Sequence, residues 1–269
     1  MGLSDELSVE VLGAALPHRA IRSYPALLST EAEALAWARA GAPDGAVVAA
    51  GYQASPRGRA GRLWPPAGDR GVAFSMIVRP QLAAAREGWL YAIAAAGVAS
   101  ATGDDASIAW PDEVYREGEL AGAVGVQTAL GPHGLQWGVI SVLVRDARPS
   151  RARALAAVVR AIEETNKRPS GETLDDYSRR CRTLGRHVSA RMIPLGPAGP
   201  CVSGRAVGLL KDGALLIETS GGRRVPVRPQ NLGLLDDETD AYEPGAGRGS
   251  SPAASPPGSP PRSTGSSPG

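Results

Sequence analysis

Hydrophobic and polar positions follow two different periods along the first 185 residues. Apolar residues spaced three and four apart predict four helices, at 29–43 ("STEAEALAWARAGAP"), 81–101, 150–165 and 173–185. Short apolar or alternating runs predict five strands, at 45–53, 71–80, 107–111, 119–130 and 135–144. Thr30, with Glu33 three residues later, predicts a capping box at the start of the first helix. This mixture of elements predicts an α+β domain over residues 1–185.

The pattern changes to short β runs after residue 185. Asp212-Gly213 and Gly221-Gly222, which are typical of hairpin turns, separate these runs. About 50 residues of this kind predict a small β-barrel over 186–235. From Asp240 onward proline, glycine and serine dominate, so no packed core can offset the entropy of ordering. We therefore expect a disordered tail over 236–269.

Composition narrows the class of protein. The chain has 269 residues, of which 43% are hydrophobic and 21% charged, and its formal net charge is +2. No apolar run reaches the roughly 18 residues of a membrane span, and no signal segment is evident. The two cysteines and three histidines have no metal-binding spacing, so we expect no metal held by side chains. These features predict a cytoplasmic protein that is not a membrane protein.

The segment with most chemical information is "PRGRAGRLW", residues 56–64. Arg57, Arg59 and Arg62 are separated by Gly58 and Gly61, and Trp64 follows. Guanidinium groups bind phosphate and carboxylate oxygens in pairs, and glycine lets the backbone approach a ligand closely. The residues alone leave three interpretations open: a ligand-binding loop, a solvated surface turn, or a contact for RNA.

Together with its neighbours, this segment resembles the biotin protein ligases. "PRGRAGRLW" is similar to the family's GRGRxGRxW loop, with Pro56 in place of the first glycine. In order along the chain, the further similar segments are Ser29-Thr30-Glu31, Gln53, "FSMIVRP" (74–80), "AWPDE" (109–113), "ELAGAVGV" (119–126) and "YSRRCRTLGRHV" (177–188). The resemblance covers about residues 20–235, and it is the ordered set of motifs that makes it specific.

The resemblance implies a fold, a reaction and a set of site residues. The fold would be a class II synthetase-like catalytic domain, with a mixed sheet and packed helices, followed by an SH3-like barrel. In the family, the carboxylate of biotin attacks the α-phosphate of ATP with Mg²⁺, giving biotinyl-AMP and pyrophosphate. A lysine of a biotin carboxyl carrier domain then takes the biotin.

The same resemblance assigns residues to the parts of that site. The implied biotin-binding residues are Ser29, Thr30, Gln53, Arg57, Gly58 and Arg59. The implied nucleotide-binding residues are Arg57, Arg59, Gly61, Arg62 and Trp64. The implied pocket strands carry Trp110, Pro111, Gly122 and Ser141. No helix-turn-helix pattern precedes the domain, so we expect a non-repressor form that binds no DNA, and a homodimer is an open possibility.

Several positions depart from the family pattern where the chemistry would occur. The lysine that opens the family's KWPND strand is Ala109, and no other catalytic residue is assigned. Asp112, Glu113, Glu119, Ser141 and Glu31 also differ from the family residues. Removing one such charge commonly costs about 10²–10³-fold in rate, and Lys211 is the only lysine considered as a replacement. The sequence therefore predicts a divergent ligase with weakened catalysis, or alternatively an inactive homologue that binds biotin, its adenylate or a carrier domain.

Structural interpretations of these residues also stay open. Trp110 and Pro111 suit a strand that packs and turns, Gln53 suits a helix cap, and Trp64 suits a cover for the core. The basic segment from Arg145 to Arg191 suits a solvated face or a surface for an acidic carrier domain. A third hypothesis, an arginine-rich nucleic-acid binder, is disfavoured by the small net charge and few aromatic residues.

Overall fold

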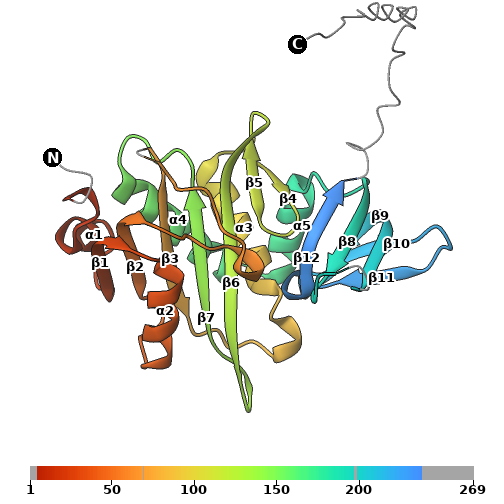
Figure 1. The fold of residues 1–269 in the computed structure, drawn as a ribbon, viewed down its shortest axis with the longest axis horizontal. Helices are drawn as coiled ribbons and strands as arrows, with labels where there is room; N and C mark the ends of the chain where they lie inside the picture. The colour runs from red at the N-terminus through yellow and green to blue at the C-terminus, as the bar shows by residue number, and fades with distance from the viewer. Residues whose placement is uncertain (1–4, 69, 197–198, 238–269) are drawn as a thin grey trace, which may run out of the picture.

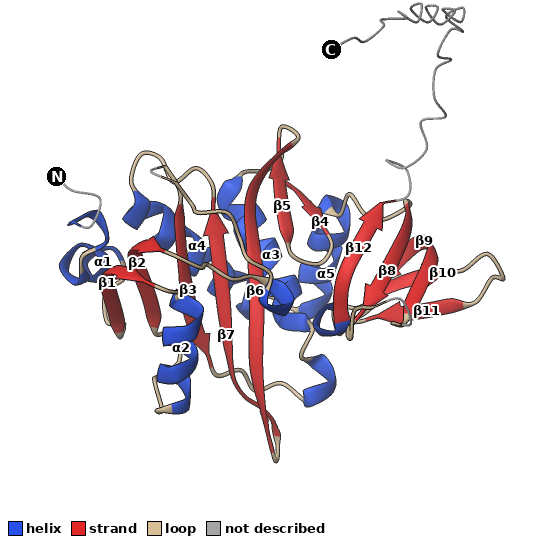
Figure 2. Ribbon diagram, in the orientation of Figure 1, coloured by secondary structure: helices blue, strands red, loops and turns tan. Residues whose placement is uncertain are grey.

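The computed structural model describes residues 5–68, 70–196 and 199–237, and its architecture is shown in Figures 1 and 2. Two β-sheets lie side by side, with helices packed against the larger one. One apolar cluster is continuous from the larger sheet to the smaller one, since buried Val188, Leu215 and Leu232 belong to the same cluster as Phe74 and Ile140. Among the described residues, no helix has the length and apolar character that spanning a membrane requires.

The larger sheet has seven strands in the order β1-β2-β3-β7-β6-β5-β4. Their bounds are β1 Ile21–Leu27, β2 Val47–Gln53, β3 Val72–Val78, β4 Ser107–Ala109, β5 Glu113–Arg116, β6 Glu119–Gly131 and β7 Gly134–Val144. β1 pairs with β2 in parallel, and the other pairs are antiparallel. The expectation of a mixed sheet is confirmed, although β1 and β5 were not predicted from the sequence.

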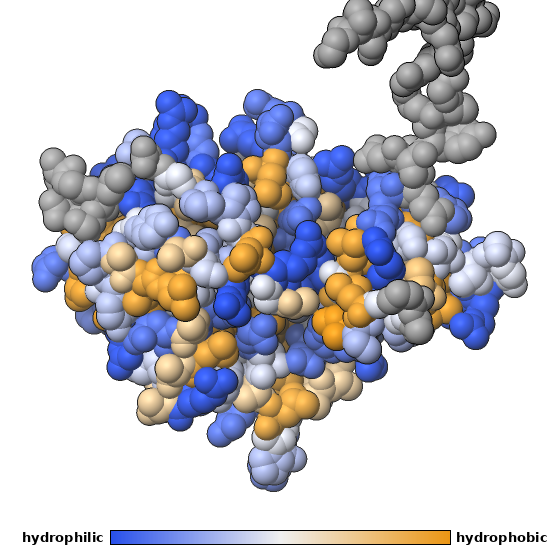
Figure 3. Space-filling view, in the orientation of Figure 1, coloured by the Kyte–Doolittle hydropathy of each residue, from blue (hydrophilic) through white to orange (hydrophobic). Residues whose placement is uncertain are grey.

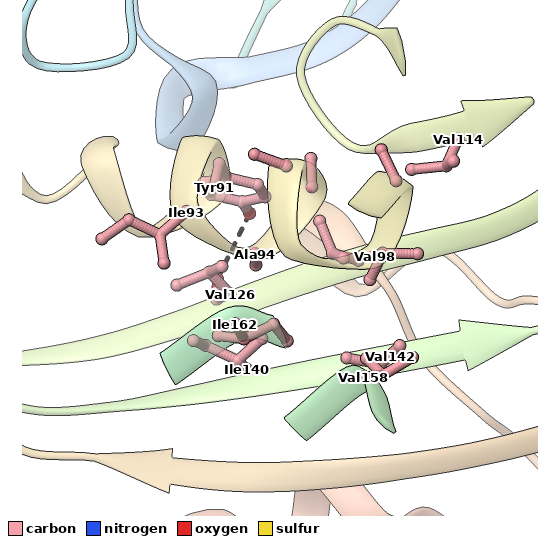
Figure 4. Close-up of a cluster of buried hydrophobic side chains, with 14 of the residues drawn as sticks. Tyr91, Ile93, Ala94, Val98, Val114, Val126, Ile140, Val142, Val158 and Ile162 are labelled. Atoms are coloured by element: carbon pink, nitrogen blue, oxygen red, sulfur yellow. Dashed lines mark hydrogen bonds between the residues drawn. The ribbon is translucent and has the colours of Figure 1, made fainter. Parts of the chain in front are cut away.

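Helices cover both faces of this sheet. α1 Val9–Ala15, α3 Trp89–Thr102 and α4 Arg151–Lys167 pack on one face, and α5 Ser170–Arg180 packs on α3. α2 Thr30–Arg39 packs on the opposite face, in front of β3 and β7 in Figure 2. Figure 4 shows the α3 side of the core, where Ile93 and Val98 of α3 belong to one buried cluster with strand residues such as Ile140.

Three helix predictions are corrected at their ends. Ser29, and not Thr30, is the N-cap of α2, because the Ser29 hydroxyl accepts the Glu31 N–H. α3 begins at Trp89 and not at residue 81, because the Leu82 carbonyl is already bonded to the Leu135 N–H. α5 ends at Arg180, because residues 181–183 leave the helix and pair beside β4. For α3 and α5 the competing bond comes from a distant part of the chain.

The smaller sheet is antiparallel, in the order β11-β10-β9-β8-β12. Its strands are β8 His187–Met192, β9 Cys201–Leu209, β10 Leu215–Glu218, β11 Arg224–Val227 and β12 Leu232–Asp237. Gly213 and Gly222 have φ of +82° and +75°, as the predicted hairpin turns require. This second sheet agrees with the expected SH3-like module.

The boundary at the end of the smaller sheet differs from the predicted one. β12 continues to Asp237, because Asp236 and Asp237 pair with Ser189 and Val188 of β8. The first two residues of the predicted tail are therefore strand residues. The rest of that prediction, 238–269, lies outside the described residues. The division of the chain at residues 185 and 186 stays a prediction.

Candidate functional site

The segment of residues 56–64, here called the arginine-glycine loop, lies on the face of the larger sheet that α2 also covers. Figure 1 shows it in orange, crossing the front of the sheet from β2 to β6. A Cβ atom added to Gly125 of β6 would lie 2.8 Å from both the Cα and the carbonyl carbon of Gly58. The loop backbone therefore rests directly on β6, and this close approach requires glycine at position 125.

The side chain of Trp64 packs against the loop. A Cβ atom on Gly58 would lie 2.4 Å from the indole nitrogen of Trp64, so the ring packs directly over this glycine. Trp64 also packs against the buried cluster of Ala73, Ala123 and Leu143. The ring therefore covers core, as the structural interpretation expected. Its assignment to the nucleotide stays a prediction.

A buried line of polar side chains crosses the sheet beside the loop. The Thr30 hydroxyl lies 2.9 Å from the Ser75 hydroxyl, which lies 2.9 Å from the Ser141 hydroxyl. The Gln53 carbonyl oxygen accepts the Thr30 N–H at 2.8 Å, and the Gln53 amide donates to the Ala73 carbonyl at 2.8 Å. The structure thus brings Thr30, Gln53 and Ser141 together, and it gives Gln53 the capping contact considered above.

Glu31 adds a buried carboxyl next to this line. Its residue is 6% exposed, and its Oε2 atom has no hydrogen-bond partner among the described residues. Burial raises the pKa of Glu31 to about 7, and the guanidinium of Arg57 opposes this rise. Near neutral pH the group therefore exists both as an acid that donates a hydrogen bond and as a carboxylate that accepts one.

Arg59 joins the loop to two other parts of the chain. Its Nε donates to Asp112 Oδ2 at 3.0 Å, and its Nη1 donates to the carbonyls of Leu232 and Gly233 at the start of β12. Arg59 is only 4% exposed. Burial raises the pKa of Asp112 to about 6, against the effect of the Arg59 charge. Arg59, which the resemblance assigns to both biotin and the nucleotide, therefore also links the loop to the smaller sheet.

Trp110 and Pro111 make structural contacts in the turn after β4. The Trp110 backbone N–H donates to Thr183 Oγ1 at 2.9 Å, and its indole N–H donates to the Gly213 carbonyl at 3.0 Å. The Pro111 carbonyl accepts the Tyr177 hydroxyl at 3.2 Å. These contacts agree with the packing interpretation.

The other assigned positions lie in different places. A Cβ on Gly122 would lie 2.9 Å from Val98 of α3, on the face of the sheet away from the loop. Ser29 caps α2 and is buried. Arg57 and Gly61 lie on the exposed side of the loop. Sequence reasoning missed Gly125 and Ser75, although the glycine within "AGAVGV" was a signal for a close backbone approach.

A cavity of about 120 Å³ lies where the two sheets meet. Figure 3 shows hydrophilic residues along the boundary between the two sheets on the face that it draws. Ala109 lines this cavity, so the position where the family has lysine does face an open space. Lys211 does not line it, and its carbonyl accepts from Arg86 at 3.4 Å. The lining residues are Arg59, Arg62, Ala109, Trp110, Asp112, Glu113, Arg182, Thr183, Arg186, Val188, Leu235 and Asp237.

Metal ligands are not gathered at this cavity. No group of three or more His, Cys, Asp and Glu side chains suited to a metal occurs in the part of the chain that the structure describes. Mg²⁺ that arrives with ATP takes most of its ligands from phosphate and water, so it needs one or two carboxylates at most. Asp112 and Glu113 line the cavity together with Ala109, and Glu113 pairs with Ala109 between β4 and β5. The expectation of Mg²⁺ stays a prediction.

A mixed sheet with an arginine-glycine loop on its face, joined to a small antiparallel module, defines the class of the fold as that of biotin protein ligases. The biotin protein ligase of Aquifex aeolicus in complex with biotin and ATP has a TM-score of 0.62 and 20% identity, covering 81% of this chain and 99% of that one. A biotin protein ligase-like protein of unknown function from Silicibacter has a TM-score of 0.60 and 13% identity, covering 80% and 96%.

Sequence comparison adds a similarity to known ligases. No family model matches the chain. The bifunctional ligase/repressor BirA of Bacillus subtilis is 31% identical over 128 residues, and that of Bacillus spizizenii is 30% identical over the same length. The match covers 46% of this chain and 37% of these relatives, so it spans a little over a third of their length. These matches show that part of the chain is similar in sequence to known biotin ligases, and the solved structures show that it shares their fold.

Proposed function

We propose that this protein is a ligase that activates biotin with ATP to biotinyl-AMP and transfers the biotin to a lysine of a biotin carboxyl carrier domain. The observation that carries the proposal is the position of the arginine-glycine loop. The loop rests on β6 beside the buried polar line, and Arg59 and Arg62 line the cavity next to Ala109. The loop therefore lies between a polar pocket floor and a cavity lined by positive charge.

The charges of this site suit an acyl-adenylate reaction. A carboxylate oxygen of biotin attacks the α-phosphorus, the bond to the leaving oxygen breaks, and pyrophosphate departs with the bonding electrons. Arg57 and Arg62 would bind the phosphate oxygens, because a guanidinium group can donate two hydrogen bonds to a pair of such oxygens. The neutral amine of the carrier lysine then attacks the acyl carbon, AMP leaves, and the nitrogen loses a proton to solvent. Thr30 and Ser141 would form the floor beneath the biotin ring.

Two solved relatives support the choice of substrates. The Aquifex aeolicus ligase was solved with biotin and ATP. The biotin acetyl coenzyme A carboxylase synthetase of Helicobacter pylori was solved with biotinylated ATP, and it has a TM-score of 0.58 and 19% identity over 78% of this chain and all of that one. We extend these ligands to the present chain because its overall fold is similar to theirs.

The second candidate function is binding without ligation. It is favoured by Ala109, which brings no charge to the cavity, and by Arg59, which is already paired with Asp112. Such a protein would hold biotin, biotinyl-AMP or a carrier domain and release it unchanged. A ligase with weakened catalysis, as predicted from the sequence, would be intermediate between an active ligase and a protein that only binds these ligands.

The deciding experiment is intact-mass spectrometry of a carrier domain incubated with this protein, biotin and ATP, with pyrophosphate measured in parallel. A mass increase of one biotin that needs both substrates is the expected result. Pyrophosphate release without a labelled carrier would limit the function to adenylation. If neither signal appears, calorimetric titration with biotin, a non-hydrolysable adenylate analogue and the carrier domain tests the binding function. No heat from any of the three would exclude both functions.

A further inference from the structure

The cavity beside Ala109 holds more positive charge than its own carboxylates neutralise. Four arginines and three carboxylates line it. Two of the arginines form ion pairs: Arg59 with Asp112 at 3.0 Å, and Arg186 with Asp237 at 2.7 Å. Among the described residues, neither Arg62 nor Arg182 has an ion pair with a carboxylate. Two uncommitted guanidinium groups facing one cavity are typical of an anion site.

Backbone pairing places Arg182 next to Ala109. Cys181 forms a parallel bridge with Ile108, and the Arg182 N–H donates to the Ile108 carbonyl at 2.9 Å. One residue further along, the Trp110 N–H donates to Thr183 Oγ1 at 2.9 Å. Residues 181–183 therefore run alongside β4 as a short extra strand. In such a pair, lateral neighbours project from the same face, and both Ala109 and Arg182 line the cavity.

The guanidinium of Arg182 is also held in place. Its carbon atom lies 4.7 Å from the centre of the Tyr115 ring. The Tyr115 hydroxyl donates to Glu113 Oε2 at 2.8 Å, and Glu113 pairs with Ala109 across the β4–β5 hairpin. An arginine that stacks on an aromatic ring keeps its N–H edges available for oxygen atoms. Arg182 is thus oriented toward the space beside Ala109 by the Tyr115 ring, by the β4–β5 hairpin and by the short extra strand.

We propose that Arg182, together with Arg62, binds the phosphate of the nucleotide in this cavity, and that Arg182 supplies from the neighbouring strand the positive charge that Ala109 lacks. The inference rests on the proposed function and makes it more specific. The substitution is local, because the charge would come from a side chain on the strand next to position 109. The cavity of about 120 Å³ has room for one phosphate group with bound water, while the rest of the nucleotide extends out of it.

The test compares Arg182→Gln with a matched control. Glutamine keeps much of the length and stacking of arginine but removes its charge. Arg179→Gln is the control, because Arg179 lies on nearby α5, does not line the cavity and has a side chain that is 70% exposed. We expect Arg182→Gln to lower kcat/KM for ATP in pyrophosphate release by about 10–100-fold, since a charge-assisted hydrogen bond contributes roughly 1.5–3 kcal/mol. Arg179→Gln should match the unchanged protein, and all three should have the same Tm.

A rescue variant separates a charge role from a structural one. Ala109→Lys in the Arg182→Gln background restores a cation at the same cavity, so most of the lost activity should return. In the otherwise unchanged chain Ala109→Lys should have little effect. A gain of about tenfold or more there would mean that the charge is missing, and it would overturn the inference. Failure of the rescue would also overturn it.

The same series distinguishes the two levels of the proposal. If the unchanged protein releases pyrophosphate and Arg182→Gln does so equally well, the role of Arg182 is refuted and the ligase function stands. If the unchanged protein neither releases pyrophosphate nor gives heat with a non-hydrolysable adenylate analogue, the function fails and the role of Arg182 fails with it. If it binds the analogue without turnover, the affinities of Arg182→Gln and of the rescue variant decide the question.

Discussion

The free energy of unfolding should depend on pH in part because of Glu31. Its carboxyl is buried with Oε2 unpartnered, and burial raises its pKa to about 7 from an ordinary value of 4.5. The folded state therefore holds this proton more tightly than the unfolded state. The contribution of Glu31 is complete below pH 4.5, and it is lost as the pH rises from there through about 7. Glu31→Gln removes the titrating group while keeping the shape of the side chain.

The size of the effect follows from the same shift. A difference of one pKa unit corresponds to about 1.4 kcal/mol, so a rise from 4.5 to about 7 corresponds to about 3 kcal/mol. The unchanged protein should lose roughly that much unfolding free energy between pH 5 and pH 8 through Glu31. Glu31→Gln should lose correspondingly less over this range, and at pH 8 it should be the more stable protein. Urea denaturation at a series of pH values measures both quantities.

Glu33 provides a control on the same helix. It bonds with Tyr24 and Arg22, each at 2.8 Å, and these contacts lower its pKa. A lowered pKa gives stability that is present above the unfolded value and is lost only as the pH falls through the folded one. Glu33→Gln should therefore change stability by a constant amount between pH 6 and pH 8. The reasoning about Glu31 is refuted if Glu31→Gln leaves the slope between pH 5 and pH 8 unchanged.

Two further substitutions test how the loop is seated. Gly125→Ala places a methyl group 2.8 Å from the Gly58 backbone, so it should cost about 1–3 kcal/mol and weaken biotin binding in calorimetry. Gly208→Ala is its control, since nothing lies within 4 Å of that position; equal behaviour of the two variants would mean that the loop does not rest on β6. Asp112→Ala leaves buried Arg59 unpaired and should cost about 3–5 kcal/mol in urea denaturation. Replacing Arg59 by Met in the same chain should recover part of this loss, and a larger loss in the double variant would contradict the ion-pair argument.

Most of the larger sheet could be predicted because its central strands are buried on both faces. Runs such as that of β3, Val72–Val78, are apolar at almost every position and stop at proline. β1 could not be predicted in the same way. Its sequence "IRSYPAL" contains Arg22 and Pro25 and shows no alternation, and it becomes a strand because an edge position tolerates proline and β2 pairs with it in parallel.

The errors at the ends of the helices have one physical origin. Ser29 and Thr30 are both good caps by residue type, so local preference cannot choose between them. The choice is made by Gln53 and Ser75, which bind the backbone and the hydroxyl of Thr30 and so leave Ser29 to cap. Both partners are more than twenty residues away in sequence, beyond the reach of any local pattern.

The candidate site also has parts that local sequence reveals and parts that depend on distant contacts. The loop was recognisable because charge and flexibility are properties of its own residues, whereas the surface that receives it depends on Gly125, whose role exists only once β6 and the loop are in contact. For the same reason, the sequence alone does not reveal that an arginine from a neighbouring strand lies beside Ala109. Arg182 and Ala109 lie 73 residues apart in sequence, like the bonded pair of Thr183 and Trp110. The loss of a charged residue at one position of a strand therefore does not by itself show that the site lacks the charge. A side chain from the neighbouring strand can bring a charge to the same point in space, and only the structure shows which residues are neighbours.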